Sequence, residues 1–117
     1  MNNYKFSYDK EHDDLFIYDP ESKSKGSVEL GDIVLDFNST KEFVGIQLMN
    51  ASKILTEISG EKEMRTILRD MVDCRVEAKV HRSLLIIKIL LITDTTQYSS
   101  VLSVPHILES SPALVSG

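Results

Sequence analysis

The first half of the chain alternates apolar and polar residues over several short segments. Tyr4, Phe6 and Tyr8 share one side of a predicted strand, because residues two apart in an extended chain point the same way. The charged segment 9–14 follows, and then the β-forming segment 15–18, which is closed by Asp-Pro. This pattern predicts an antiparallel hairpin with a charged loop.

A second pair of strand-like segments follows the connector at 22–27. In the segment 28–37, Ile33, Leu35 and Phe37 share one face and Val34 and Asp36 the other, and the Gly-Asp pair at 31–32 predicts a bulge or bend within a single strand. Turn-forming residues at 38–41 precede an alternating segment at 43–49. We therefore expect the segment 43–49 to return as the partner strand.

The spacing of the apolar residues changes in the middle of the chain, from every second residue, typical of a strand, to about every 3.6 residues, typical of a helix. Asn50 is a typical N-cap, whose side chain accepts hydrogen bonds from the first amides of a helix, and it precedes the helix-compatible segment 51–58. Gly60 favours a helix end. Two helices are therefore predicted, at about 51–58 and 61–72. The second has apolar residues at helical spacing, namely Met64, Ile67, Leu68, Met71 and Val72.

The last third of the chain predicts a β-meander. Residues 74–81 alternate, whereas residues 84–93 are nearly all apolar, so the latter strand is expected to be covered on both faces. A turn at 94–97 and a third strand at 98–104 follow. The tail, residues 106–117, has no clear period.

Together these segments predict an α+β fold with antiparallel β-sheet, one or two central helices and a C-terminal β-meander. A length of 117 residues with 42% hydrophobic content fits one domain. Within this domain we distinguish a β module at 4–58, an extension with a helix and the meander at 61–105, and the tail at 106–117.

Charge and cysteine content narrow the class of protein. The net charge of −5 repels phosphate backbones and anionic lipids, which disfavours nucleic acid and membrane surfaces as partners. The apolar segment 84–92 is shorter than the ~20 residues of a membrane helix and contains Lys88. The single cysteine, Cys74, and a beginning without the features of a secretory signal predict a cytoplasmic protein.

Two stretches carry a resemblance to a known family. YDKEHDDLFI at 8–17 and DIVLDFNSTKEFVGIQLMNAS at 32–52 resemble the family catalogued as domain of unknown function 2283. Gln47 and Asn50 stand where that family usually has Glu and Asp. The resemblance implies a small β-rich domain without an established activity. It also implies another small protein as a partner, because similar proteins are associated with small toxin-like proteins.

The acidic loop is the first candidate site. Asp9, Glu11 and Asp13 have the spacing of the first three ligands of a calcium loop. However, Asp14 and Pro20 stand where such a loop needs Gly and Glu. No metal or cofactor is therefore predicted, and Asp9 is expected to bond nearby loop amides instead.

The predicted strand-to-helix corner at 50–53 is the second candidate site. The first amides of a helix attract anions, so Asn50 and Ser52 join the acidic loop in an alternative hypothesis, a small-molecule or anion-binding protein or an enzyme. The sequence has no G-x-S-x-G, H-E-x-x-H or glycine-rich phosphate loop, so no catalytic residue is assigned. Cys74 and His81 are seven apart on one predicted strand and face opposite ways, which argues against zinc.

The preferred hypothesis is a non-catalytic interaction module that self-associates. A strand as apolar as 84–92 needs cover on both faces, and a small domain has few elements to provide it. A second copy of the chain is the expected cover. This predicts a homodimer with an interface at Leu85, Ile87, Ile89 and Leu91.

Overall fold

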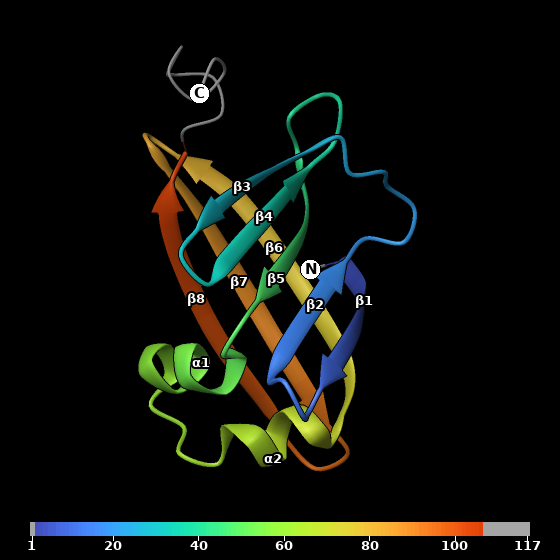
Figure 1. Ribbon diagram of the computed structural model, residues 1–117, viewed down its shortest axis with the longest axis vertical. Helices are drawn as coiled ribbons and strands as arrows, with labels where there is room; N and C mark the ends of the chain where they lie inside the picture. Colours follow the sequence, from blue (N-terminus) through green and yellow to red (C-terminus); the bar gives the residue numbers. More distant parts are fainter. Residues whose placement is uncertain (1, 107–117) are drawn as a thin grey trace.

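The chain folds into one curled antiparallel sheet of eight strands with two helices between the fifth and sixth strands (Figure 1). The computed structural model describes residues 2–106. The strand order in the sheet is β3-β4-β5-β2-β1-β6-β7-β8. This arrangement confirms the predicted α+β fold. The strands are β1 (Asn2–Asp9), β2 (Asp14–Tyr18), β3 (Gly26–Leu30), β4 (Ile33–Phe37), β5 (Phe43–Leu48), β6 (Met71–His81), β7 (Leu84–Thr93) and β8 (Gln97–Pro105).

Strand β1 belongs to both halves of the curled sheet. Its beginning pairs with β6, where Tyr4 lies opposite Cys74, and the rest pairs with β2, starting from Lys5 opposite Tyr18. The sheet folds over at this strand, so that β3, β4 and β5 lie across the meander of β6, β7 and β8 (Figure 1). The inner faces of both halves contribute to one apolar core.

Two helices close one end of this core (Figure 1). Helix α1 (Ala51–Ser59) confirms the first predicted helix, and it buries Ala51 and Leu55 completely. Helix α2 (Met64–Arg69) buries Met64 and Leu68 in the same core. The helices therefore supply apolar cover at the end where the two halves of the sheet separate.

The segment 28–37 is a hairpin and not the single bent strand that its apolar pattern predicts. Strands β3 and β4 pair with each other, with Leu30 directly opposite Ile33. The two residues between them turn the chain back, and Gly31 has a φ of 63° there. A residue without Cβ adopts this left-handed conformation without strain, so the glycine permits a tight reversal that we had interpreted as a bend.

The second helix is shorter than the predicted 61–72. Helix α2 ends at Arg69, and Met71 already pairs with Thr93 at the start of the β6–β7 ladder. Met71 is buried in the core from a strand, whereas Val72 is 54% exposed. Pairing with β7 therefore decides the conformation of these residues against their helical spacing, because tertiary context overrides local preference.

The predicted interface residues lie inside the molecule. Leu85, Ile87, Ile89 and Leu91 are at most 4% exposed, because they point from β7 toward the strands of the N-terminal half. The prediction that a second subunit covers these four side chains is therefore wrong. The opposite face of β7 was expected to be covered too, yet Leu84 is 40% exposed on it.

The two helices are short. Helix α1 has nine residues and α2 has six, and none of the helices in residues 2–106 has the length and apolarity that membrane crossing requires.

Candidate functional site

Asp13, at the end of the β1–β2 loop, lies against the first turn of α1 and is only 5% exposed. Its Oδ2 accepts hydrogen bonds from the Ser52 hydroxyl at 2.6 Å and from the Ser52 amide at 3.1 Å. Its Oδ1 accepts one from the Tyr8 hydroxyl at 2.5 Å, and its backbone carbonyl accepts one from the Ala51 amide at 2.8 Å. Asp13 therefore caps α1 from a loop far away in the sequence.

This cap replaces the one that we predicted at Asn50. The Asn50 backbone is in the left-handed region, with a φ of 52°, and its side chain makes no capping hydrogen bond with the helix. Its amide nitrogen instead donates to Asp32 at 3.1 Å. A carboxylate is a stronger acceptor for helix amides than a neutral amide oxygen, so Asp13 takes the capping position.

The surroundings of Asp13 keep its carboxyl group ionised. Burial is the largest single influence and acts to raise the pKa of Asp13. The hydrogen bonds from Ser52 and Tyr8, together with the charge of Arg65 at 3.7 Å, outweigh burial, so the pKa is lowered overall. In return, desolvation and the bond to Asp13 raise the pKa of Tyr8 to about 12. Tyr8 is therefore neutral and available as a donor.

Asp9 fixes the other end of the loop, as expected. Its Oδ1 accepts hydrogen bonds from the amides of Glu11 at 3.0 Å and His12 at 3.2 Å. Its Oδ2 lies 2.7 Å from Nδ1 of His12, which lowers the pKa of Asp9 and raises that of His12. Residues 2–106 contain no group of three His, Cys, Asp or Glu side chains placed to hold a metal ion.

The structure does not bring the five predicted ligand residues together in one site, and Asn50 bonds to Asp32 outside both the loop turn and the cap. Asp9 binds the Glu11 amide in the loop turn, and Asp13 with Ser52 forms the helix cap. The Ser52 amide, which an anion at the helix start would need, is already bonded to Asp13. The arrangement therefore leaves this corner without the free amide on which the anion-binding hypothesis depends.

Comparison with known proteins shows the family of this chain. The model of the family "Protein of unknown function (DUF2283)" matches residues 5–52. The uncharacterized protein MJ0789 of Methanocaldococcus jannaschii is 31% identical over 85 residues, which cover 73% of this chain and 69% of that protein. The chain belongs to this family of unknown function. No solved structure matches it. The matched residues include Tyr8, Asp13 and Ser52, the three side chains of the helix cap.

The outer face of β7 carries an apolar stripe, as its nearly continuous apolar sequence predicts, but this stripe is partly exposed to solvent. We call Leu84, Ile86, Leu90 and Ile92 the outer stripe; these residues alternate with the buried ones and point away from the core. Lys88 lies in the middle of the stripe, opposite Glu77 of β6 and Val101 of β8. Both faces of β7 are apolar, and Lys88 is the residue in 84–92 whose charge distinguishes the outward face from the inward one.

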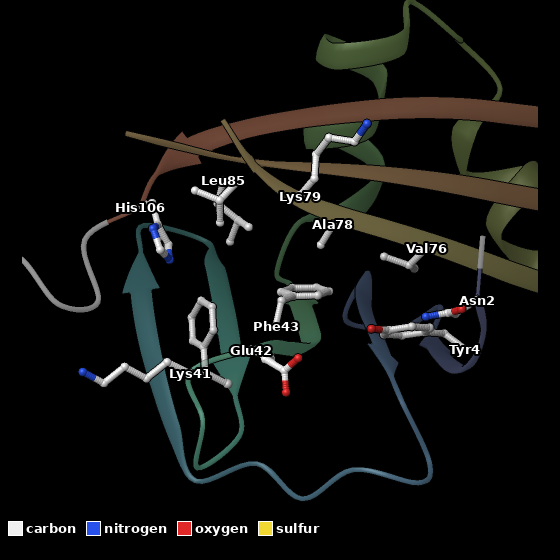
Figure 2. A pocket seen from close by; sticks show the side chains of 12 residues that line it. Asn2, Tyr4, Lys41, Glu42, Phe43, Val76, Ala78, Lys79, Leu85 and His106 are labelled. Carbon is white, nitrogen blue, oxygen red and sulfur yellow. The ribbon is translucent and has the colours of Figure 1, made fainter. Parts of the chain in front are cut away.

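A cleft of about 360 Å³ opens between the two halves of the sheet, at the end away from the helices (Figure 2). Tyr4, Phe37 and Phe43 line it from the N-terminal half, and Ala78 and Leu85 line it from the meander. Lys41 and Glu42 lie at its rim, whereas the Lys79 side chain points to the outer face of β6 (Figure 2). These residues come from distant segments, so no local motif predicted the cleft.

Cys74 is a core residue with low reactivity. Desolvation by burial, assisted by the charge of Asp73, raises the pKa of its thiol to about 12. The thiolate is the nucleophile, so we expect iodoacetamide at about pH 8 to alkylate the urea-unfolded protein much faster than the native protein. Mass spectrometry after timed alkylation measures both rates. Equal rates would contradict the burial of this side chain.

Proposed function

We propose that the protein is a non-catalytic cytoplasmic interaction module that forms a homodimer through the outer stripe of β7. The observation that carries the proposal is the position of these apolar side chains on a face that points away from the core. Val101 of the neighbouring strand extends the apolar surface and is 47% exposed. Exposed apolar surface of this kind is typical of protein interaction sites.

The sequence of the outer stripe suits contact with a second copy of itself. Two apolar residues precede Lys88 and two follow it at the same spacing, so a two-fold rotation about Lys88 places apolar residues on apolar residues. Glu77 lies beside Lys88 in the β6–β7 ladder. In such a dimer the two Lys88 side chains meet at the axis, and the Glu77 beside each of them places an opposite charge next to them.

A binding role is also supported by the hydrogen bonds that polar side chains of the family-matched segment make within the protein. The carboxylates of Asp9 and Asp13 are used in the loop turn and the helix cap. The single cysteine is buried with a raised thiol pKa, which is compatible with a reducing compartment.

The variant Leu90→Lys tests the dimer. Leu90 lies opposite Arg75, so a lysine there places a second positive charge beside an existing one in the middle of the proposed contact. We expect the wild type to be a dimer and Leu90→Lys to be a monomer with an unchanged circular dichroism spectrum. Size-exclusion chromatography with light scattering over a concentration series measures the mass.

Phe16→Lys is the matched control for this experiment. Phe16 is 39% exposed on β2 and is also an outward apolar residue, but it lies in the N-terminal half of the sheet. This variant is expected to remain a dimer. A wild type that is monomeric at every concentration, or a Leu90→Lys variant that stays dimeric, would remove the proposal.

A further inference from the structure

We propose that the outer face of the N-terminal half of the sheet binds an arginine-bearing segment of a partner protein. In this complex the guanidinium group stacks on Phe16 and Tyr18 and donates hydrogen bonds to the carboxylate of Asp36. This binding activity does not depend on the proposed dimer, because the outer stripe lies on β7 of the meander, whereas these three residues lie on β2 and β4.

Strand pairing defines this outer face. Residues opposite each other in an antiparallel ladder point to the same side of the sheet, so the pairing from β3 to β1 places ten outward positions in two neighbouring rows. One row is Glu29, Val34, Gln47, Phe16 and Ser7, and the other is Ser27, Asp36, Gly45, Tyr18 and Lys5. Both helices lie at one end of the core and the meander lies on the inner side, so neither covers these rows (Figure 1).

Two aromatic rings stand in contact on this face. Phe16 and Tyr18 point outward from β2, with their ring centroids 4.9 Å apart and their planes inclined by 28°. Phe16 is 39% exposed although its neighbours Leu15 and Ile17 are fully buried. An accessible ring face attracts cations, and the planar guanidinium group of arginine also stacks on it. The aromatic pair therefore favours arginine over a neutral ligand.

A carboxylate acceptor lies beside the aromatic pair. Gly45 has no side chain, and Oδ2 of Asp36 and Cβ of Tyr18 approach the point where its Cβ would be, at 3.3 Å and 3.5 Å. Oδ1 of Asp36 accepts a hydrogen bond from the Ser27 hydroxyl, whereas Oδ2 accepts none from the side chains among residues 2–106. A guanidinium group has a flat face for the rings and N–H donors at its edge for this oxygen.

The charge of this half of the chain favours a basic partner. Residues 1–60 carry six Lys and Arg against eleven Asp and Glu, whereas residues 61–117 carry seven of each. In the two outward rows Glu29 and Asp36 are acidic and Lys5 is basic, and Asp14 precedes Phe16 by two residues on the same side of β2. Surfaces of opposite charge attract each other and steer association, so the charge complements the aromatic pair in selecting a cation.

Titration of the full chain with three capped tripeptides tests the proposal. Tri-arginine is the probe, tri-lysine keeps its charge without the planar group, and tri-citrulline keeps the planar group without the charge. Amide chemical shifts in NMR spectra give both the affinity and the location, and we expect tri-arginine to change them mainly in β2, β4 and β5. Tri-lysine is expected to bind about threefold more weakly and tri-citrulline about tenfold more weakly.

Four variants separate the contributions of the ring and the charges. Phe16→Leu removes a ring and Asp36→Asn removes the acceptor charge, and each is expected to weaken tri-arginine about threefold. Lys5→Glu replaces the cation opposite Tyr18 and is expected to strengthen binding about threefold. Asp94→Asn is the matched control, because it removes the same charge as Asp36→Asn from an exposed turn between β7 and β8.

The outcomes decide the proposal directly. Shifts centred on the two outward rows, with an affinity that Phe16→Leu and Asp36→Asn reduce and Asp94→Asn does not, support it. Tri-lysine or tri-citrulline binding as tightly as tri-arginine would overturn the assignment of a guanidinium ligand. Equal losses for Asp36→Asn and Asp94→Asn, shifts centred elsewhere, or an absence of saturable binding would overturn the site itself.

Discussion

The Ile87→Lys variant is expected to be unfolded under conditions in which the wild type is fully folded. Ile87 has no exposed surface and lies between Ala78 of β6 and Leu102 of β8, with its side chain in the core. Removing an isoleucine from such a position costs about 2–5 kcal/mol, and a buried ammonium without a partner costs several kcal/mol more. These losses approach the total of about 5–15 kcal/mol that holds a typical domain together.

Ile86→Lys is the matched control for this prediction, since it introduces the same side chain one position earlier. Ile86 belongs to the outer stripe and is only partly buried, so the ammonium reaches water there. We expect Ile86→Lys to be folded and monomeric. Circular dichroism melting curves and NMR dispersion distinguish the two variants. A folded, monomeric Ile87→Lys would contradict the assignment of this residue to the core and restore the interface first predicted for it.

Replacing Asp13 by alanine is expected to lower the free energy of unfolding by about 3 kcal/mol, as measured by urea denaturation. The substitution removes the cap of α1, which is worth about 1 kcal/mol. It also leaves the Tyr8 hydroxyl and the Ser52 hydroxyl without the carboxylate that they share, and bonds to a charged group contribute about 1.5–3 kcal/mol.

Asp9→Ala provides the matched control, because it removes a carboxylate from the same loop. Asp9 is exposed and its hydrogen bonds stay within the loop. The free energy of unfolding is therefore expected to fall much less in Asp9→Ala than in Asp13→Ala. If Asp9→Ala lowered the free energy of unfolding as much as Asp13→Ala, the loop turn and not the helix cap would be the feature that stabilises the fold.

The contribution of Asp13 also depends on pH. Its pKa in the folded protein is lowered, so its contribution to stability is fully present above the pKa of the unfolded state. That contribution is lost as the pH falls through the lowered folded-state value. The wild type is therefore expected to lose stability more steeply than Asp13→Asn in this acidic range, and urea midpoints measured over a pH series give the comparison.

In the N-terminal half, alternation predicted the strands around 4–8, 15–18 and 43–49, but not the hairpin within 28–37. The inward and outward sides of β4 and β5 agree with the pattern, because a half-buried strand shows its orientation in every second residue. Gly45 lies on β5 where the backbones approach closely, since a Cβ there would lie 3.2 Å from the Ile17 carbonyl oxygen.

Local sequence patterns could not predict the helix cap or the cleft, because each is formed by segments that lie far apart in the sequence. The bond between Asp13 and Ser52 joins a hairpin loop to a helix, and neither segment alone indicates its partner. Asn50 had the right residue type for a cap, yet a stronger acceptor from elsewhere in the chain took its place. For β7, apolarity predicted the strand correctly, but the four side chains assigned to an interface lie in the core, and Lys88, the polar residue within 84–92, marks the outward face.

The sharing of β1 between two ladders has a consequence for the order in which a newly made chain is completed. The later part of β1 pairs with β2 in a local hairpin. Tyr4 can form its ladder only after Cys74 has been synthesised, because its partner strand β6 lies much later in the chain. Until then, the inner surface of the N-terminal strands has no opposite wall. The nascent chain therefore exposes apolar surface of the kind that favours aggregation until β6 has been made.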